Sequence, residues 1–466
     1  MTPHTLPRAM TRAAGALLVA FALFLTARPA AANPAFARKY GTSCTTCHVV
    51  YPKLNPFGEA FRRNGFRFPG IDSDVVKQET VALGQEAYKK TFPYSVWPGT
   101  LPVTVPIAVG FNGSITMHPD VHSSAGQADN GTAISVQDLI GEGHVWAGGA
   151  FDDTITYYGE MTFSKDGVEL EHAIVVFNDL FFGPHALNLR VGKTIAGVTS
   201  FGQHSSYVGD TLLAPLAVTA LYGSGTDAWN LVDSYPGIEL NGVIGGRFDY
   251  SAGFNAGANM DVRNSQSVYA HVGTKLGGLR LDGEGGGGGG DPMKPWAERS
   301  LTLDTFIYRT ASRYADLNNK NQNDTAIAFG AHLRGQLGSL ELNSGVYQEQ
   351  HTRATALGQG VNALTQYNEL SYVVFPWLVP AVRFEYARLS PTVANATAIH
   401  DLRFIPGVAA LVRPNLKLTL VGQLEQAYGA PDGGWGASGG SAAPGAKSQT
   451  VNLELESINL GLAFAF

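Results

Sequence analysis

The sequence contains very little cysteine and little charge. Only 2 of its 466 residues are cysteine, which excludes a disulfide-stabilised scaffold. Charged residues make up 15% of the chain, against about a quarter in an average globular protein. Intrinsic disorder is excluded because 44% of the residues are hydrophobic and 10% are aromatic, which is too much apolar surface to remain in water. The 56 glycines favour turns and strands over helices.

No apolar run reaches the length of about 20 residues that a transmembrane helix needs. The longest run lies near the N-terminus, after two basic residues and before three small ones (Arg8 and Arg12; Ala13 to Thr26; Ala30 to Ala32). A charged start, a short apolar run and small residues at a cleavage point are typical of a secretory signal peptide. We therefore expect residues 1–32 to be removed near Ala32 and the mature chain to be exported.

The charge is distributed unevenly along the chain. Removal of Arg8, Arg12 and Arg28 with the signal peptide takes the formal charge from −6 to −9. Residues 33–70 carry six basic residues against Glu59, a balance of +5 that leaves −14 for the remainder (Arg38, Lys39, Lys53, Arg62, Arg63, Arg67). A small basic segment next to a large acidic one favours their association. Because the basic part is small and has this use, we expect no nucleic-acid partner.

Both cysteines lie in one motif, Cys44-Thr45-Thr46-Cys47-His48, shortly after the expected cleavage site. C-x-x-C-H is the attachment pattern of c-type haem, in which two thiols add to the haem vinyl groups. The following histidine can then coordinate the iron from the proximal side. We therefore expect one covalently bound haem c, with Cys44 and Cys47 as the thioether residues and His48 as the proximal iron ligand.

Other uses of a C-x-x-C pair are disfavoured. A thioredoxin-type redox pair would be surrounded by a βαβ pattern, which is absent. A zinc site would need a second Cys pair or a His pair at suitable spacing. A disulfide here would close too short a loop to add much stability.

The residues after the motif predict a short helix. Asn55 is a suitable N-cap, Pro56 suits the first helical position, and Gly65 is a plausible stop. Phe57 and Phe61, four residues apart, share one face that either covers a haem or forms a small core. Arg62 and Arg63 are candidate partners of the haem propionates, or else part of a solvated face.

A second axial ligand is missing near the motif. Between Cys47 and residue 116 there is no methionine, and His48 is the only histidine. The iron is then five-coordinate, bound by a weaker group, or ligated from the rest of the chain. The nearest candidates in sequence are Met117, His118 and His122, so the distal ligand is left open.

From about residue 100 the apolar residues fall at every second position. Examples are Val105 to Met117, Ile155 to Phe163, Leu187 to Val191, Phe248 to Phe254, Leu301 to Ile307 and Ile458 to Phe466. Period 2 indicates strands with one apolar face, and we count about 16 of them, give or take two. A soluble sandwich or propeller is one way to arrange such strands. Their length, near the roughly 10 residues that cross a bilayer at a tilt, favours a transmembrane antiparallel β-barrel.

The last strand also favours the barrel, because it alternates up to the final residue, Phe466, as strands recognised by the outer-membrane assembly machinery do. Four stretches do not read as strands: 71–100, a linker or part of the N-terminal unit; 195–235, a long connection that could fold into the lumen; the glycine run 285–290; and 429–447. We thus expect a signal peptide (1–32), a cytochrome c segment with linker (33–100) and a mainly β outer-membrane barrel (101–466).

The run Pro34-Ala35-Phe36-Ala37-Arg38-Lys39-Tyr40-Gly41-Thr42-Ser43 before Cys44 resembles the fused cytochrome–porins of bacterial outer membranes, as do Leu54, Phe57-Gly58, Phe61 and Gly65. This match covers about 35 residues. The resemblance implies a single-haem cytochrome segment ahead of a porin-like barrel, and the best-known members oxidise ferrous iron at the cell surface. Lys39-Tyr40 departs from those members, so the resemblance specifies the haem site better than the iron substrate.

Three functions are compatible with these features. The first is an outer-membrane electron conduit between the cell surface, with Fe(II) as one candidate donor, and a periplasmic c-type cytochrome. Its lumen or loop carboxylates could attract iron (Asp152, Asp153, Asp249, Glu284), and it would be a redox protein, not a hydrolase. The second is a transport porin with a sensing or gating cytochrome plug. The third is a peroxidase-like haem enzyme with an open sixth position.

Overall fold

The computed structural model describes most of the chain after the expected signal peptide. The described residues are 35–68, 80–82, 86–94, 100–102, 107–119, 132–136, 139, 141–151, 154–198, 234–256, 263, 265–284, 294–315, 321–354, 359–393, 398–428 and 453–465. Several residues named above lie outside them: 1–32, His122, Asp152, Asp153, the glycine run 285–290, 429–447 and Phe466.

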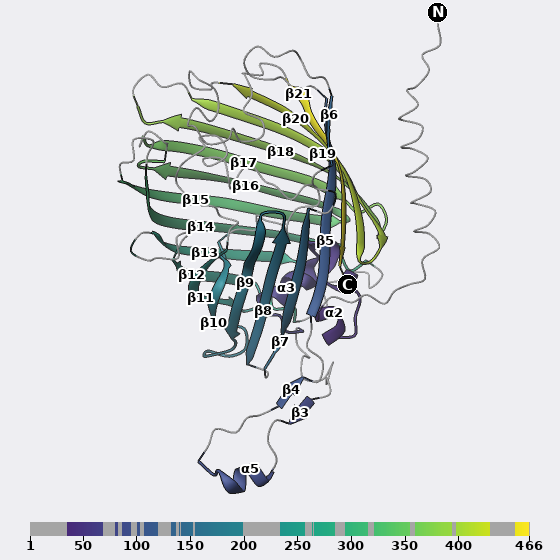
Figure 1. Ribbon diagram of the computed structural model, residues 1–466, viewed down its shortest axis with the longest axis vertical. Helices are drawn as coiled ribbons and strands as arrows, with labels where there is room; N and C mark the ends of the chain where they lie inside the picture. The colour runs from purple at the N-terminus through teal and green to yellow at the C-terminus, as the bar shows by residue number, and fades with distance from the viewer. Residues whose placement is uncertain are drawn as a thin grey trace, which may run out of the picture.

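The dominant element is one closed antiparallel barrel (Figure 1). Its strands are β5 (Ile107–His118), β6 (Ala133–Ser135), β7 (Glu142–Ala150), β8 (Ile155–Ser164), β9 (Gly167–Phe177), β10 (Asn188–Ile195), β11 (Ser234–Ile244), β12 (Phe248–Asn255), β13 (Ser265–Gly277), β14 (Glu298–Ala315), β15 (Asn321–Gly338), β16 (Leu340–His351), β17 (Val361–Tyr372), β18 (Leu378–Pro391), β19 (Ile399–Arg413), β20 (Leu416–Tyr428) and β21 (Glu454–Ala465).

These segments fill sixteen positions around the barrel. β6 and β7 share one position, because both pair with β5: Thr116 lies opposite Ser135 of β6, and Ile107 opposite Ala147 of β7. β21 closes the barrel by pairing with β5, with Leu460 opposite Ile115. Among the described residues the prediction of a barrel of about 16 strands is therefore confirmed.

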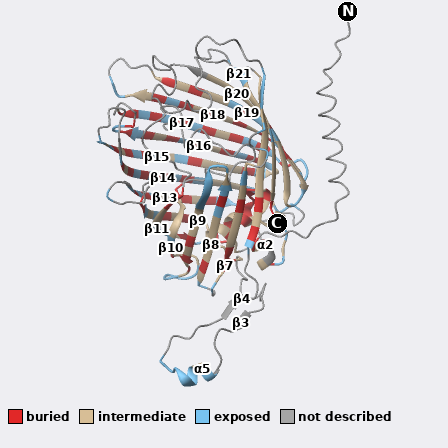
Figure 2. Cartoon of the chain, viewed as in Figure 1, coloured by how far each residue is buried: buried red, intermediate tan, exposed pale blue. Residues whose placement is uncertain are grey.

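Alternate residues of a strand face the lumen and the outside. The outward face is apolar, whereas the lumen face carries buried charged and polar side chains together with apolar ones such as Ala363, Ala387 and Leu389. In β16, Glu341 and Asn343 are 3% and 1% exposed, whereas Leu340 and Leu342 are 38% and 40% exposed. Figure 2 shows the same alternation along the long strands. A soluble sandwich would bury the apolar face, so this arrangement excludes it.

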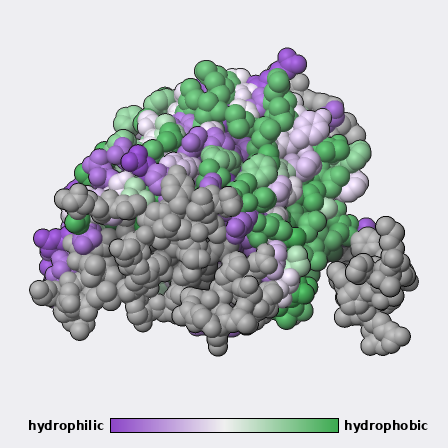
Figure 3. All heavy atoms as spheres, turned by 90° about the horizontal axis from the view of Figure 1, so that it is seen from above, coloured by the Kyte–Doolittle hydropathy of each residue, from purple (hydrophilic) through white to green (hydrophobic). Residues whose placement is uncertain are grey.

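The outward apolar side chains come from most of the barrel strands. Exposed examples include Ile238, Ile244, Phe248, Val268, Leu303, Ile307, Phe329, Leu364 and Leu420. Hydrophobic residues gather on the barrel surface seen in Figure 3. Such a face is suited to lipid, which is the expected partner of an outer-membrane barrel. No described helix is long and apolar enough to span a membrane.

The two ends of the barrel differ. One end, called here the turn end, holds the start of β5, the last described residue Ala465 and the short turns at 245–247, 339 and 414–415. The opposite end, called the loop end, holds most of the longer connections, including the one from β10 to β11. That connection was predicted as 195–235. The prediction was too long at both borders, because β10 includes Ile195 and β11 begins at Ser234; residues 196–198 are outside the strands, and residues 199–233 lie outside the described part. In outer-membrane barrels the short turns face the periplasm.

Residues 35–68, called here the plug, lie inside the barrel at the turn end (Figure 1). The plug comprises α2 (Ala35–Lys39), the 3-10 helix η1 (Cys44–Thr46), β1 (His48–Val50), β2 (Lys53–Leu54) and α3 (Pro56–Arg63). The predicted helix is confirmed: Asn55 caps it, and Gly65 follows it with φ +63°. β3 (Thr80–Ala82), β4 (Thr100–Pro102) and α5 (Glu86–Thr91) are the described elements of the stretch 71–100.

Placing a charge on the outward face tests whether that face meets lipid. Ile307 lies mid-strand in β14 and is 53% exposed. We expect Ile307→Arg to lower the free energy of unfolding in lipid vesicles by about 2–4 kcal/mol, the usual cost of a cation near the bilayer midplane. Ile307→Leu, which keeps the face apolar, should leave the denaturant midpoint nearly unchanged. Equal stability of Ile307→Arg and wild type would contradict a lipid-facing position.

Candidate functional site

The C-x-x-C-H turn is shaped by its contacts with the start of α3. The Asn55 side chain donates to the carbonyl of Thr46 (2.9 Å), and its backbone N–H donates to that of Cys47 (2.9 Å). Gly58 lies so close that a Cβ there would stand 2.1 Å from the Cys47 carbonyl oxygen. Position 58 therefore requires glycine. Together with the two hydrogen bonds of Asn55, this close packing holds the motif rigidly against α3.

Cys44 and Cys47 are both free thiols and partly exposed to one internal cavity. Burial raises the pKa of the Cys44 thiol, and burial together with the neighbouring Cys44 raises the pKa of Cys47 to about 12. A thiol-disulfide redox site instead requires a lowered pKa. The arrangement is therefore unlike a thioredoxin-type pair.

His48 is oriented by the chain that follows it. Its Nδ1 lies 3.1 Å from the carbonyl oxygen of Pro52, which can only accept a hydrogen bond. The proton is thereby assigned to Nδ1, which makes Nε2 the nitrogen that carries the lone pair. Metal-bound histidines are typically held in this way, with the second ring nitrogen donating to a backbone carbonyl.

The cavity that contains the motif has a volume of about 580 Å³, within the range of pockets that enclose organic cofactors. Its lining includes the cysteines and His48 from the plug, and His144, Trp146, Tyr158, Glu160 and His172 from β7, β8 and β9. The motif thus faces a cavity that is bounded on its other side by the barrel wall.

The two arginines proposed as propionate partners differ in their contacts. Arg63 pairs with Glu59 (2.8 Å) and with Asp249 of β12 (3.1 Å). Arg62 lines the cavity and makes no hydrogen bond or ion pair with another described residue. Burial lowers the pKa of Arg62, Glu59 raises it, and the nearby cation of Arg190 lowers it. A second anion beside Arg62 would therefore be favoured, so Arg62 is the better propionate partner.

Phe57 and Phe61 contribute to an aromatic core within the plug. Phe57 packs on Phe68 at 4.8 Å between ring centroids, and Phe61 contacts Phe36 at 5.1 Å. This core continues into the barrel wall, where Tyr158 stacks on Phe66 at 5.2 Å. The interpretation as a small core is thus supported, although Phe61 also lines the cavity.

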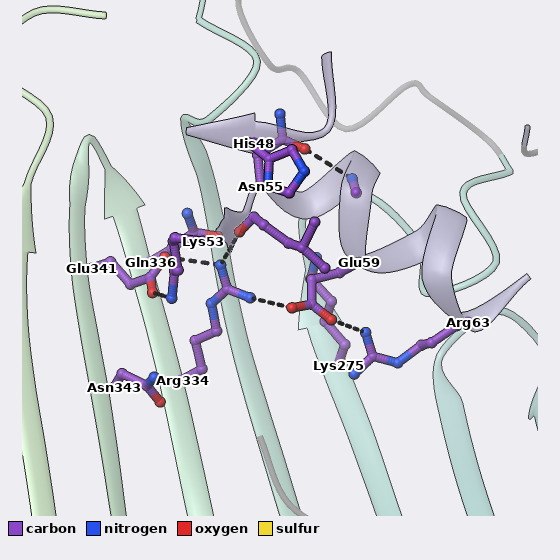
Figure 4. A network of polar contacts seen from close by, with 12 residues as sticks. His48, Lys53, Asn55, Glu59, Arg63, Lys275, Arg334, Gln336, Glu341 and Asn343 are labelled. Atoms are coloured by element: carbon purple, nitrogen blue, oxygen red, sulfur yellow. Dashed lines mark hydrogen bonds and ion pairs between the residues drawn. The ribbon is translucent and has the colours of Figure 1, made fainter. Parts of the chain in front are cut away.

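A network of opposite charges joins the plug to the barrel (Figure 4). Lys53, 0% exposed, pairs with Glu341 of β16, and Arg334 of β15 pairs with the same carboxylate at 2.9 Å. Arg334 also lies 3.7 Å from Glu59, which pairs with Arg63. The network therefore alternates in sign from Glu341 of β16, through the plug, to Asp249 of β12.

Further contacts hold the end of the plug. Arg67 pairs with Asp179, in the connection between β9 and β10, at 2.7 Å. Asn64 lies 2.6 Å from His185 of the same connection, measured from Oδ1 to Nδ1. The expected association of the basic segment with acidic parts of the chain is confirmed by these ion pairs.

The distal-ligand candidates chosen by sequence proximity lie away from this cavity. Met117 is opposite Ile458 on the outward face of β5, and His118 lies at the loop end with Nδ1 near Glu456. The motif instead meets β5 near Ala108, which is opposite Trp146. Ten residues of strand separate Ala108 from His118, roughly 33 Å. The structure does not bring Met117 or His118 together with His48, and His122 lies outside the described residues.

The described carboxylates proposed to attract iron have structural contacts. Asp249 binds Arg63, and Glu284 lies 3.4 Å from His185. Within the described ranges, no group of three or more His, Cys, Asp or Glu side chains is arranged to hold a metal ion. His144 and His172, which line the cavity, were missed because they are about 100 residues from the motif and only the folded barrel brings them near it.

No protein-family model and no curated protein matches the chain. A solved structure of a loop-deletion mutant of OmpT, an outer membrane protein of Vibrio cholerae, matches with a TM-score of 0.50 and 10% identity, over 78% of this chain and 99% of that one. The anion-selective porin from Comamonas acidovorans matches with a TM-score of 0.49 and 13% identity, over 78% and 99%. The fold is therefore that of a porin-like outer-membrane barrel, and membership of the fused cytochrome–porins stays a prediction.

Removing one charge from the buried network should loosen the plug. We expect Lys53→Met to lower the free energy of local opening of α3 by about 3 kcal/mol. This is the lower end of the cost of breaking a buried ion pair, because Arg334 still pairs with Glu341 in the variant. Hydrogen exchange of residues 53–63 measures this. The double variant K53M/E341Q should lose less than the sum of its single variants. Strict additivity would show that the two charges do not interact.

Acid should release the plug. Burial tends to raise the pKa of Glu59, but Arg63 and Arg334 outweigh it and lower the pKa to about 2. The stabilisation by this carboxylate is thus complete above its ordinary value of 4.5 and is lost as the pH falls toward 2. Asp179, with its pKa lowered by Arg67, adds to the effect. Near-UV circular dichroism of the aromatic core between pH 6 and 2 measures it. Glu59→Gln should reduce the pH dependence, and an unchanged dependence would contradict this origin.

Proposed function

We propose that this chain is an outer-membrane barrel that carries one covalent haem c at its turn end and transfers electrons between a periplasmic c-type cytochrome and a donor on the lumen side. The observation that carries the proposal is the juxtaposition of two thiols and an oriented imidazole on one cavity inside the barrel. The apolar outward face and the porin-like fold support the outer-membrane location.

The residues fit the group in three respects. Cys44 and Cys47 are not joined by a disulfide and both line the cavity, as thioether formation requires. His48 presents Nε2 as its basic nitrogen because Nδ1 is directed at Pro52. Arg62 supplies a cation suited to a propionate. When bound, haem c supplies a one-electron redox couple, with a potential that depends on axial ligands, burial and hydrogen bonds.

The remaining residues hold this site at one end of the barrel. The ion pairs through Lys53, Arg63 and Arg67 fix the plug to three parts of the wall, so that the motif keeps one position at the turn end. A carrier in the periplasm can reach that end if the chain is oriented as other outer-membrane barrels are. The barrel separates lipid from lumen, which allows a soluble donor such as Fe(II) to approach from the loop end and give up one electron.

A second candidate is a solute-transporting porin in which the plug senses or gates. The likeness of this chain's barrel to that of the outer membrane protein OmpT favours it. It predicts solute conductance in planar bilayers, with larger conductance for Lys53→Met, in which the plug is loosened. The electron conduit predicts low conductance in wild type.

A visible spectrum of the purified protein tests the main proposal. We expect haem c bands that remain with the polypeptide after denaturation and that become reduced on anaerobic addition of a competent donor, with ferrous iron tried first. Cys44→Ala and Cys47→Ala should each remove one thioether link, and the double variant should lose covalent haem. Reduction by dithionite alone would exclude iron as the donor, and the absence of haem from wild type would overturn the proposal.

A further inference from the structure

Arg62 lies on the face of α3 that meets the C-x-x-C-H turn. Gly58 packs against the carbonyl oxygen of Cys47, and Arg62 is four residues further along the helix, on the same face. The Arg62 side chain lines the same cavity as both cysteines. An anionic group held in the cavity beside the motif is therefore within the surroundings of this guanidinium.

The charged groups around Arg62 leave it without a counter-ion. Burial has the largest effect on its pKa and lowers it; two carboxylates raise the pKa and two cations lower it (Glu59 and Glu239; Arg190 and Arg63). Glu59 already pairs with Arg63 at 2.8 Å and lies 3.7 Å from Arg334. Arg62 is thus a third cation among two carboxylates, and among the residues that the structure describes neither carboxylate pairs with it.

Glu239 of β11 is fully occupied by other donors. Four donors lie within 3.0 Å of its two oxygens: Arg190 Nη1 at 3.0 Å, Asn241 Nδ2 at 3.0 Å, the Tyr269 hydroxyl at 2.9 Å and the Gly197 backbone N–H at 2.8 Å. A carboxylate offers about four lone-pair sites, so all of them are used. Glu239 therefore fixes Arg190 but has no site left for Arg62.

Arg190 of β10 has donors to spare on the same cavity. Its side chain lines the cavity from the barrel wall, and only Nη1 is paired with Glu239. Its Nε is buried and has no hydrogen-bond partner within the described part of the chain. A guanidinium carries five N–H groups in a fixed fork, and a buried donor without an acceptor is costly. Arg62 and Arg190 are thus two neighbouring cations, from the plug and the wall, that together lack an anion.

We propose that Arg62 of the plug and Arg190 of the barrel wall together bind one propionate of the haem. This rests on the proposed function, because it requires haem at Cys44 and Cys47. A carboxylate between two guanidinium groups accepts charge-assisted hydrogen bonds from both and neutralises their mutual repulsion. The haem would then join the plug to β10, in addition to the ion pairs through Lys53, Arg63 and Arg67.

The test compares full-length, haem-loaded variants by redox titration and by the propionate bending band in resonance Raman spectra, which responds to hydrogen bonds on the propionate. We expect Arg190→Gln to shift this band. It should also lower the equilibrium constant for reduction about tenfold, or about 59 mV for one electron, because a nearby cation favours the reduced haem. Arg62→Gln should have the same two effects. The double variant R62Q/R190Q should lose less than the sum, since both side chains act on one carboxylate.

Two control variants separate contact from charge. Arg190→Lys keeps the cation but not the fork, so it should recover most of the potential and only part of the band position. Lys193→Gln removes a cation from the same strand, one that pairs with Glu169 at 3.1 Å and is not among the described residues that line the cavity, and it should keep the wild-type values. Because Arg62 has no ion pair to lose, Arg62→Gln keeps the test valid if Arg190→Gln does not fold.

A free inorganic anion would use the same chemistry, and phosphate distinguishes the two sources. In C44A/C47A, which cannot hold haem covalently, inorganic phosphate should increase the hydrogen-exchange protection of residues 56–63, and adding Arg190→Gln should abolish this effect. In haem-loaded wild type phosphate should have no effect, because the propionate occupies the pair. Equal protection by phosphate in both proteins would assign the pair to a free anion and overturn the proposal.

The band position decides the remaining outcomes. An unchanged band in both Arg62→Gln and Arg190→Gln, with haem in place, would overturn the assignment, even if the potential fell, because the cations would then act only at a distance. Absence of haem from wild type would instead refute the proposed function itself.

Discussion

Opposite charges buried between the plug and the barrel wall determine where the C-x-x-C-H motif lies. Lys53 and Arg334 share Glu341 of β16, and Arg63 joins Glu59 to Asp249 of β12. Charges taken out of water are costly unless they are paired, so each member of this network requires the others. The plug satisfies its charges in the position seen, and that position places the motif on a cavity lined by β7, β8 and β9.

The aromatic core makes the same position specific in shape. Phe36 packs against the wall at Gly148, where a Cβ would stand 2.4 Å from its ring, and Phe66 stacks on Tyr158. Charge and shape thus agree on one arrangement. Because the wall forms one side of the cavity, the environment of any cofactor there is shared between a small helical segment and a barrel. Neither part encloses the cavity alone.

Because the barrel wall forms one side of the cavity, the barrel contributes side chains to the site as well as enclosing the plug. In a porin, lumen-facing side chains select solutes, whereas here the row Trp146, Glu160 and His172 faces the plug. The outward face remains apolar, with Ile238 and Ile307 each 53% exposed, so the same strands meet lipid on one side and the plug on the other. This is possible because successive side chains of a strand point to opposite faces of the sheet, so that alternate residues contact lipid and plug.

Features that depend on neighbouring residues could be predicted from the sequence. The motif Cys44 to His48, the helix capped by Asn55 and the alternation that predicted about 16 strands are all local patterns, and the structure describes the helix and the barrel as expected. Which side chains meet across the lumen could not be predicted from local patterns, because it depends on how the barrel and the plug fold together. Met117 is near the motif in sequence yet faces outward, whereas His172 is distant in sequence and lines the cavity. Strand register and plug docking determine such proximity, and the docking depends on ion pairs between residues more than 100 positions apart.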